Sequence, residues 1–280
     1  MFHARLIRPA AISLALVWTA GAHAADGFGA DPAFPESRWG VSLGAFAGFE
    51  PAYEGSDEFR FVGYPLIVPR YYGANYDPNE PARVDFRGID DIRFTAVRYG
   101  GLDVGALAGY GFGRDEGLSN RLSGLGDIDG GLAVGGFVAY RFNPLFVDFA
   151  YHTQITGDTD TGYTLRFGAG IEQNLSERMA LTAYVGGSYA SEEYMDAYFS
   201  ITPAQAALSG AGLGVFDAAA GFKDVGIDLG LAYQITDRVT LQTKAGYARL
   251  LEDAANSPVT ASRNQFSGGL GFTYTFGRTE

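Results

Sequence analysis

The most constraining feature of this chain is a strict alternation of apolar residues with small or polar ones. Residues 224–235 read DVGIDLGLAYQI, and their apolar set occupies every second position: Val225, Ile227, Leu229, Leu231, Tyr233 and Ile235. Successive side chains of a β-strand point to opposite faces, so this segment has one apolar face and one small or charged face.

The same alternation returns along almost the whole chain. It recurs at 39–50, 102–112, 128–142, 147–155, 163–172, 179–190, 239–251 and 265–276. Each run is close to the ~9–11 residues that a tilted strand needs to cross the hydrocarbon layer. A transmembrane barrel uses every apolar face against lipid, so we predict an all-β, antiparallel transmembrane β-barrel. The alternative is a soluble β-sandwich or a calycin-type barrel.

Composition favours the membrane barrel. The 280 residues include 40 glycines, 17 tyrosines and 21 phenylalanines, more than an ordinary globular domain carries. Small inward residues suit a barrel lumen, and aromatic residues at strand ends are typical of the girdles at the membrane surfaces. Beyond the N-terminus, no run of apolar residues approaches the length of a membrane-spanning helix.

The first 24 residues have the pattern of a signal peptide. Arg5 and Arg8 precede an apolar stretch, and Ala22-His23-Ala24 resembles a cleavage site. We therefore expect a periplasmic tail at 25–37 and the barrel at 38–280. The chain has no cysteine, which excludes disulfides and a lipid anchor on a cysteine. Its net charge of −12 argues against nucleic-acid partners.

The connections between runs alternate in length. Short links lie at 99–101, 143–144, 175–178 and 236–238, and long ones at 50–60, 113–127, 191–221 and 252–262. We predict short periplasmic turns and long external loops. The long loops are acidic, for example at Glu50, Glu54, Asp57 and Glu58. We interpret this as a solvated rim; the alternative is divalent-cation bridging to lipopolysaccharide.

The number of strands depends on residues 83–98. One long strand there would aim Asp90 at lipid near the bilayer middle, which costs a few kcal/mol. A turn near Gly88 to Asp91 avoids this and gives twelve strands, two of them short. Ten strands, with part of 60–98 outside the wall, is the alternative.

Several motifs resemble the MipA/OmpV family of outer-membrane proteins. They are P-x-Y-x-G-S at 51–56, GRDE at 113–116, GLGDID at 124–129, YMxxYF at 194–199, TPAQA at 202–206, KDV at 223–225 and DAANSPV at 253–259. The resemblance covers essentially the whole chain after the signal peptide. One departure is that Gly277-Arg278-Thr279-Glu280 follow Phe276, whereas such barrels usually end on an aromatic residue.

The resemblance implies a non-enzymatic protein that tethers a periplasmic murein hydrolase to a peptidoglycan synthase. Such a partner could reach 25–37, the 72–81 connection and the short turns, with Phe28, Phe34, Tyr72 and Tyr76 as anchors. The segments 25–37 and 72–81 could instead be disordered linkers. Outer-membrane lipids and lipopolysaccharide are the other expected partners. The alternative functions are a narrow channel for small solutes or ions, and a surface adhesion or osmotic-response protein.

Parity also predicts which polar side chains enter the lumen. They are Asp148, His152, Arg166, Glu172, Asp224, Asp228 and Lys244, together with Asp85, Arg87, Arg93, Gln154 and Gln242. Their mixed signs favour ion pairs across the interior. About twelve strands lie between filled small barrels and open porins, so we expect a narrow or plugged lumen. Residues 202–209 could form a short helix with Thr202 as its cap.

A catalytic site is the remote alternative. His152 is the one histidine outside the signal peptide, and an acyl-transfer site would need a nucleophile such as Ser191 or Ser200 beside it. The chain has no G-x-S-x-G motif. Asp158 and Asp160 lack the later ligands of a calcium loop. We therefore expect no catalytic site, no cofactor and no metal.

Overall fold

The computed structural model describes residues 39–71 and 82–276. The predicted signal peptide, the predicted tail with Phe28 and Phe34, and the connection with Tyr72 and Tyr76 lie outside the described residues. Residues 277–280 also lie outside them.

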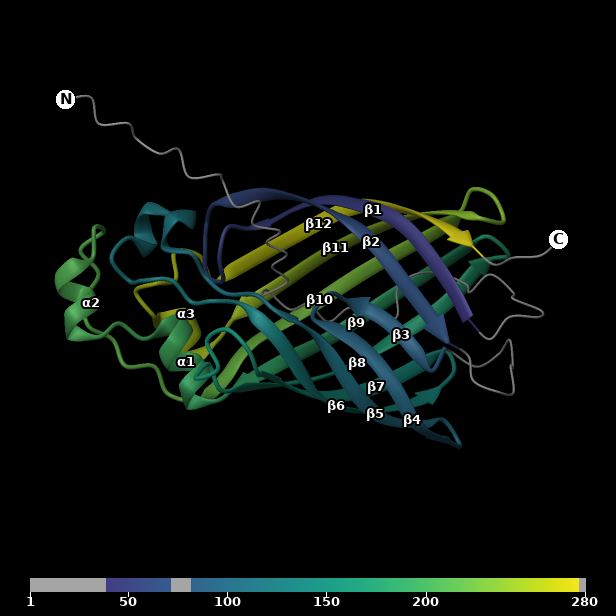
Figure 1. The fold of residues 1–280 in the computed structure, drawn as a ribbon, viewed down its shortest axis with the longest axis horizontal. Helices are drawn as coiled ribbons and strands as arrows, with labels where there is room; N and C mark the ends of the chain where they lie inside the picture. The colour runs from purple at the N-terminus through teal and green to yellow at the C-terminus, as the bar shows by residue number, and fades with distance from the viewer. Residues whose placement is uncertain (1–38, 72–81, 277–280) are drawn as a thin grey trace, which may run out of the picture.

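The described chain forms a closed antiparallel barrel in which each strand pairs with its neighbour in sequence and β1 pairs with β12 (Figure 1). The prediction of twelve strands is confirmed, and the ten-strand alternative is wrong. The strands are β1 (Trp39–Pro51), β2 (Phe59–Tyr71), β3 (Val84–Gly88), β4 (Asp91–Tyr99), β5 (Leu102–Gly111), β6 (Gly131–Phe142), β7 (Leu145–Gln154), β8 (Tyr163–Ser176), β9 (Met179–Ala190), β10 (Gly221–Gln234), β11 (Val239–Leu250) and β12 (Asn264–Phe276).

The alternation seen in the sequence corresponds to the two faces of the wall. On β10, Val225, Ile227 and Leu229 are exposed on the outside, whereas Asp224 is buried inside. β12 follows the same rule, since Phe266, Leu270, Phe272 and Phe276 are exposed while Gln265, Thr273 and Thr275 are buried. An exposed apolar band of this kind is what a barrel presents to lipid.

The turn within 83–98 falls at Ile89 and Asp90, between β3 and β4. Asp90 is buried, and its carboxylate contacts Arg166 at 2.6 Å. The turn thus keeps this charge away from lipid, which is the physical reason why twelve strands are preferred to a single long strand here. The resulting hairpin is short and stops well before the helical end of the barrel (Figure 1).

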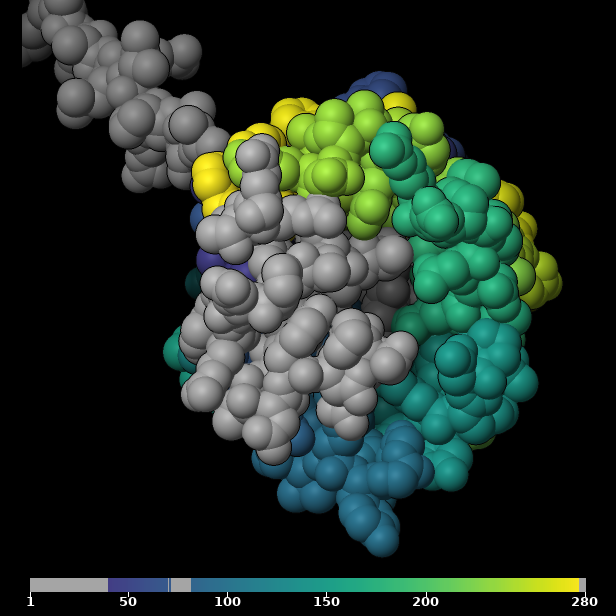
Figure 2. Space-filling view, turned by 90° about the vertical axis from the view of Figure 1, so that its right-hand side faces the viewer, coloured from purple at the N-terminus to yellow at the C-terminus, as the bar shows by residue number. Residues whose placement is uncertain are grey.

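The two ends of the barrel differ. Short turns connect the strands at one end, which Figure 2 views directly, with the turns from blue to lime placed around it. The long connections 112–130, 191–220 and 251–263 lie at the other end (Figure 1). Barrels of this class have short periplasmic turns, so the long connections are external.

The external loops pack into a cap. It contains α1 (Glu192–Phe199), α2 (Pro203–Leu208), α3 (Glu252–Asn256) and the short 3-10 turns η1 (Glu116–Leu118) and η2 (Asn120–Leu122). The predicted helix after Thr202 is confirmed as α2, with Thr202 and Gln205 forming a capping box. Buried residues from four loops form an apolar core inside the cap: Ala52, Tyr53, Leu122, Leu125, Ile201, Leu213 and Val259.

The described helices are all too short or too polar to cross a membrane.

The orientation can be tested with single cysteines, because the chain has none of its own. Ala207 on α2 and Asn256 on α3 are exposed in the cap, and Asp237 is exposed in a short turn. We expect cysteines at 207 and 256 to react with a membrane-impermeant maleimide on intact cells. A cysteine at 237 should react only after the outer membrane is disrupted. The reverse pattern would overturn the orientation.

Candidate functional site

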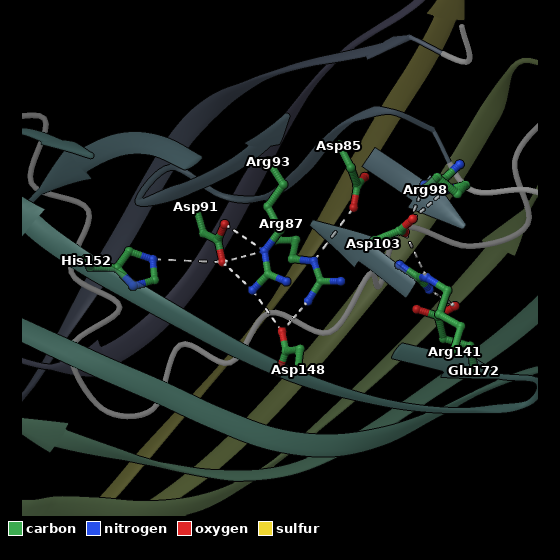
Figure 3. A network of polar contacts seen from close by, with 10 residues as sticks. All are labelled: Asp85, Arg87, Asp91, Arg93, Arg98, Asp103, Arg141, Asp148, His152 and Glu172. Carbon is green, nitrogen blue, oxygen red and sulfur yellow. Dashed lines mark hydrogen bonds and ion pairs between the residues drawn. The ribbon is translucent and has the colours of Figure 1, made fainter. Parts of the chain in front are cut away.

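The centre of the lumen holds a network of buried ion pairs (Figure 3). The Asp148 carboxylate on β7 accepts contacts from Arg87 at 2.9 Å and from Arg93 at 2.8 Å. Arg93 also forms a bidentate ion pair with Asp91, in which Nε and Nη2 each donate to a carboxylate oxygen at 3.0 Å. The Tyr184 hydroxyl donates to the other Asp148 oxygen at 2.7 Å. We call Arg87, Asp91, Arg93 and Asp148 the central arginine network.

The central arginine network ties the β3–β4 hairpin to the opposite wall. Arg87 and the Asp91–Arg93 pair belong to the hairpin, whereas Asp148 and Tyr184 lie on β7 and β9. The Arg93 guanidinium also lies over the ring of Phe137 on β6, 4.7 Å from its centroid. Bidentate pairing and stacking are the geometries that suit a buried guanidinium.

A second group of charges lies nearer the periplasmic end (Figure 3). Asp103 on β5 accepts two hydrogen bonds from Arg98, at 2.6 and 2.9 Å. Arg141 on β6 lies 3.7 Å from Asp103 and 3.3 Å from Glu172 on β8. Ion pairs therefore connect the strands β4, β5, β6 and β8 at this level of the lumen.

A third group closes the external end. The Lys223 ammonium contacts Glu54 and lies 2.9 Å from Asp224. Tyr194 on α1 donates to Glu54 at 3.1 Å, and Ser188 donates to Asp224 at 2.6 Å. Burial raises the pKa of the Glu54 carboxyl, and the neighbouring Lys223 opposes that rise. We call Glu54, Lys223 and Asp224 the external triad.

The external triad corrects the interpretation of the acidic loops. Glu54 is buried rather than part of a solvated rim, and Glu50 belongs to β1, where it pairs with Arg60 at 2.7 Å. Asp57 and Glu58 are exposed, as expected of a rim.

Helix α1 covers a small chamber at the external end of the lumen. Tyr194 and Tyr198 stack with ring centroids 4.5 Å apart and line a chamber of about 90 Å³. The Tyr198 hydroxyl donates to the Phe112 carbonyl at 2.9 Å, and Arg114 donates to the Tyr198 carbonyl at 2.7 Å. Polar groups line the chamber on several sides, so its size and lining suit ordered water molecules.

The predicted lumen residues occupy different levels of the barrel. Asp148, Arg87 and Arg93 share the central arginine network, and Asp85 lies 3.8 Å from Arg87. His152 is buried, 4.0 Å from Asp91, and lines the chamber with Arg166 and Gln154. Glu172 lies in the periplasmic group and Asp224 in the external triad. Asp228 and Lys244 lie on β10 and β11, and Gln242 is buried on β11.

Sequence reasoning missed several partners of these residues. Asp90 and Asp91 lie at the hairpin turn, where parity breaks. Lys223 enters the lumen beside Asp224 because the register of β10 against β9 shifts between Phe222 and Asp224. Glu54 comes from a loop, which has no parity. The predicted turn near Gly88 to Asp91 locates Asp90 and Asp91 in the chain, but nothing in the sequence indicates which arginines they contact, or that Lys223 and Glu54 enter the lumen.

The serines considered for catalysis have structural contacts. Ser191 accepts hydrogen bonds from the Tyr163 and Tyr194 amides and caps α1. Ser200 donates to Asp196 and accepts from the Ala218 amide. In the part of the chain that the structure describes, no three His, Asp or Glu side chains are grouped so that they could hold a metal.

Comparison with known proteins gives a family. The family model described as MltA-interacting protein MipA matches residues 43–276. No curated protein matches the chain.

Similar solved structures are outer-membrane barrels. The outer-membrane OmpT of Vibrio cholerae is 10% identical, with 85% of this chain and 97% of that chain covered and a TM-score of 0.36. The COG4313 outer membrane channel of Pseudomonas putida F1 is 11% identical, with coverages of 85% and 96% and a TM-score of 0.38. The family match spans nearly the whole described barrel, from β1 to the last residue of β12. The chain therefore belongs to the MipA family of outer-membrane β-barrel proteins.

Proposed function

We propose that this barrel is a non-enzymatic scaffold that holds a murein-remodelling enzyme at the periplasmic face of the outer membrane. The observation that carries the proposal is the family match, because the family is described by its interaction with MltA. The partner would be a murein hydrolase of the MltA type, alone or together with a peptidoglycan synthase.

The lumen supports a role through contacts rather than permeation. Ion pairs lie at three levels of the interior, buried at the central and external levels and partly exposed at the periplasmic one, and α1 lies over the chamber at the external end. A solute passing through would have to displace charges that are already paired, and at two of the levels desolvated. Breaking such pairs is costly, which disfavours a general porin.

The periplasmic end offers limited surface for a partner. Its described part consists of turns of a few residues, with Tyr99 prominent because its side chain is 81% exposed. A stable interface usually needs roughly 800 Å² from each partner. We therefore propose that residues 25–37 and 72–81, which lie outside the described residues, add to the turns to form the docking surface.

Capture of the barrel by an immobilised MltA-type transglycosylase tests this proposal. The full chain, extracted in detergent, should be retained by the enzyme. Deletion of 25–37 or of 73–81 should abolish retention, whereas Asn256→Ala, in the external cap, should leave it intact. Retention that survives both deletions would refute the proposed docking surface.

Recordings in planar bilayers separate the scaffold from the channel. We expect purified protein to give no large, stable conductance. Arg166→Gln and Asp228→Asn should leave enzyme capture unchanged, because both side chains point into the lumen. If the protein is a channel, the same substitutions should change ion selectivity, because lumen charges set the field along a narrow path.

The remote alternative, a hydrolase that uses His152, has a separate test. Such an enzyme would lose its hydrolytic activity on His152→Ala while the barrel remains folded.

A further inference from the structure

The outer face of β11 and β12 carries two arginines at its external end. Arg249 is the last outward-facing residue of β11, on the same side of the strand as the exposed Leu241, and is itself exposed. Arg263 immediately precedes β12 and is exposed as well. Arg249 pairs in register with Asn264, and the Leu250 amide donates to the Arg263 carbonyl at 2.8 Å. The two arginines therefore occupy neighbouring positions where these strands end.

Arg249 belongs to a polar group with donors left for a ligand. Its Nη1 donates to Asn264 Oδ1 at 3.2 Å, and the Tyr247 hydroxyl donates to the same oxygen at 2.9 Å. Because Asn264 uses its oxygen for these two bonds, its amide N–H groups remain for a ligand. The guanidinium of Arg249 likewise carries more donors than this one bond uses. We call Arg249, Arg263 and Asn264 the external arginine site.

Arg263 adds a second cation to this site. It donates through Nε to the Ala255 carbonyl at 3.0 Å and through Nη2 to the Asn256 side chain at 2.8 Å, both on α3. These acceptors are uncharged. Within the described residues, neither Arg249 nor Arg263 forms an ion pair, although the chain as a whole has a net charge of −12. Both positive charges are therefore available for an anionic ligand.

The acidic side chains of this region have other contacts or lie further away. On α3, Glu252 and Asp253 each accept from a backbone amide at the start of β10 or just before it, at 3.0 Å. Asp57 and Glu58 are exposed just before β2, and β1 separates β2 from β12. Two strand spacings amount to about 10 Å, roughly a Debye length at physiological ionic strength. Solvent therefore screens most of the repulsion that Asp57 and Glu58 would exert on an anion at Arg249.

The level of the site relative to the lipid-facing band indicates the kind of anion. Toward the membrane from Arg249, the next outward-facing residue of β11 is Tyr247, whose ring packs on Phe266 with centroids 5.0 Å apart. Further down the same face, Leu270 and Phe272 are exposed to lipid. A step of two residues along a tilted strand raises Arg249 about 5 Å above the aromatic pair. A ligand that fits this surface has a negative group above and apolar chains below.

Lipopolysaccharide has this form, because its lipid A part carries phosphates at the membrane surface above several acyl chains. Arginine suits a phosphate, since its planar guanidinium donates two parallel hydrogen bonds. The connection with α3 places this end of the barrel on the external face, where lipopolysaccharide forms the lipid surface. We propose that the external arginine site binds a phosphate of lipid A directly, while acyl chains lie against Phe266 and Leu270.

Binding of defined forms of lipid A, followed by native mass spectrometry, tests this proposal. The full barrel in detergent is titrated with bisphosphorylated lipid A and with the same lipid after its phosphates have been removed. We expect the phosphorylated form to bind about tenfold more tightly, because it makes charge-assisted hydrogen bonds with the arginines. Equal affinities would overturn the proposal, since contacts with the acyl chains would then account for binding.

Matched variants locate the site on the barrel. The double variant Arg249→Gln, Arg263→Gln should lower the affinity for phosphorylated lipid A to that for the dephosphorylated form. The control is the double variant Arg178→Gln, Arg238→Gln, which removes the same charge from two exposed positions in short turns and should leave the affinity unchanged. An equal loss in both double variants, or no loss in the first, would contradict the site. Folding of each variant is verified by heat-modifiable migration on gels.

Two additions to the titration separate this site from other kinds of binding. A large excess of inorganic phosphate should not displace lipid A, because free phosphate lacks the acyl chains; displacement would indicate a site for free phosphate instead. A chelator of divalent cations should leave binding intact, because arginine contacts a phosphate without a metal. Loss of binding on chelation would indicate a metal bridge through the acidic loops and would refute direct contact.

The site is independent of the proposed scaffold role. Arg249 and Arg263 lie at the external end, whereas the proposed docking surface is periplasmic, so their double variant should still be captured by the immobilised transglycosylase. Loss of capture in this variant, with its barrel folded, would show that the two arginines do more than hold lipid A and would overturn their assignment to lipid alone.

Discussion

Replacing Asp148 with asparagine should lower the free energy of unfolding by about 3–5 kcal/mol, the cost typical of breaking a buried ion pair from one side. Asp148 accepts from both Arg87 and Arg93, and these side chains are 3% and 6% exposed. Asparagine has nearly the same shape but no charge, so the two guanidiniums would remain desolvated without the carboxylate that they share. Unfolding in urea from phospholipid vesicles, followed by heat-modifiable migration, measures the loss.

Glu172→Gln is the matched control for this effect. Glu172 also pairs with an arginine, Arg141, but at 3.3 Å, and its side chain is 34% exposed. Solvent screens such a pair, so its loss should cost less than about 1 kcal/mol. Similar losses in the two variants would show that burial does not decide the strength of these pairs, and that the central arginine network does not hold the hairpin.

The regular part of the wall could be predicted from the sequence because its physics is local. Side chains alternate with period two, so Leu229 and Asp228 fall on opposite faces wherever the strand is regular. The cost of placing Asp90 in lipid was enough to predict a turn there, and the capping residues at Thr202 were enough to predict α2. In each case the deciding residues lie within a few positions of one another.

The irregular parts required the three-dimensional structure. Phe86 packs against Phe46, Leu66 and Val68, which lie on β1 and β2 and are distant from it in sequence. Lys223 reaches the lumen through a shift in strand register, which alternation cannot reveal. Helix α1 forms over the chamber because its buried side, with Met195 and Phe199, packs on other loops of the cap. Long-range packing decided each of these features.

The functional site combines both kinds of feature. Parity predicted several members of the ion-pair groups, among them Asp148, Arg166 and Asp224. The other members Asp90, Asp91 and Glu54, which pair with Arg166, Arg93 and Lys223, lie in a turn, at a strand end and in a loop, where alternation carries no information. Ion pairs inside the lumen can therefore be expected from the sequence. The sequence does not predict which pairs form or which segment they hold in place.

The strongest test of the wall itself is a charge placed on its outer face. Leu229→Arg points a guanidinium at lipid from the middle of β10 and should cost about 2–4 kcal/mol. Gly230→Arg carries the same charge one residue further on and points it into the lumen, where it escapes the lipid penalty. Its partner in register is Lys244, and like charges directly opposite each other cost at most about 1 kcal/mol. Urea unfolding in phospholipid vesicles should therefore separate the two variants. Equal destabilisation would mean that Leu229 does not face lipid, and would overturn the assignment of the two faces on which the barrel rests.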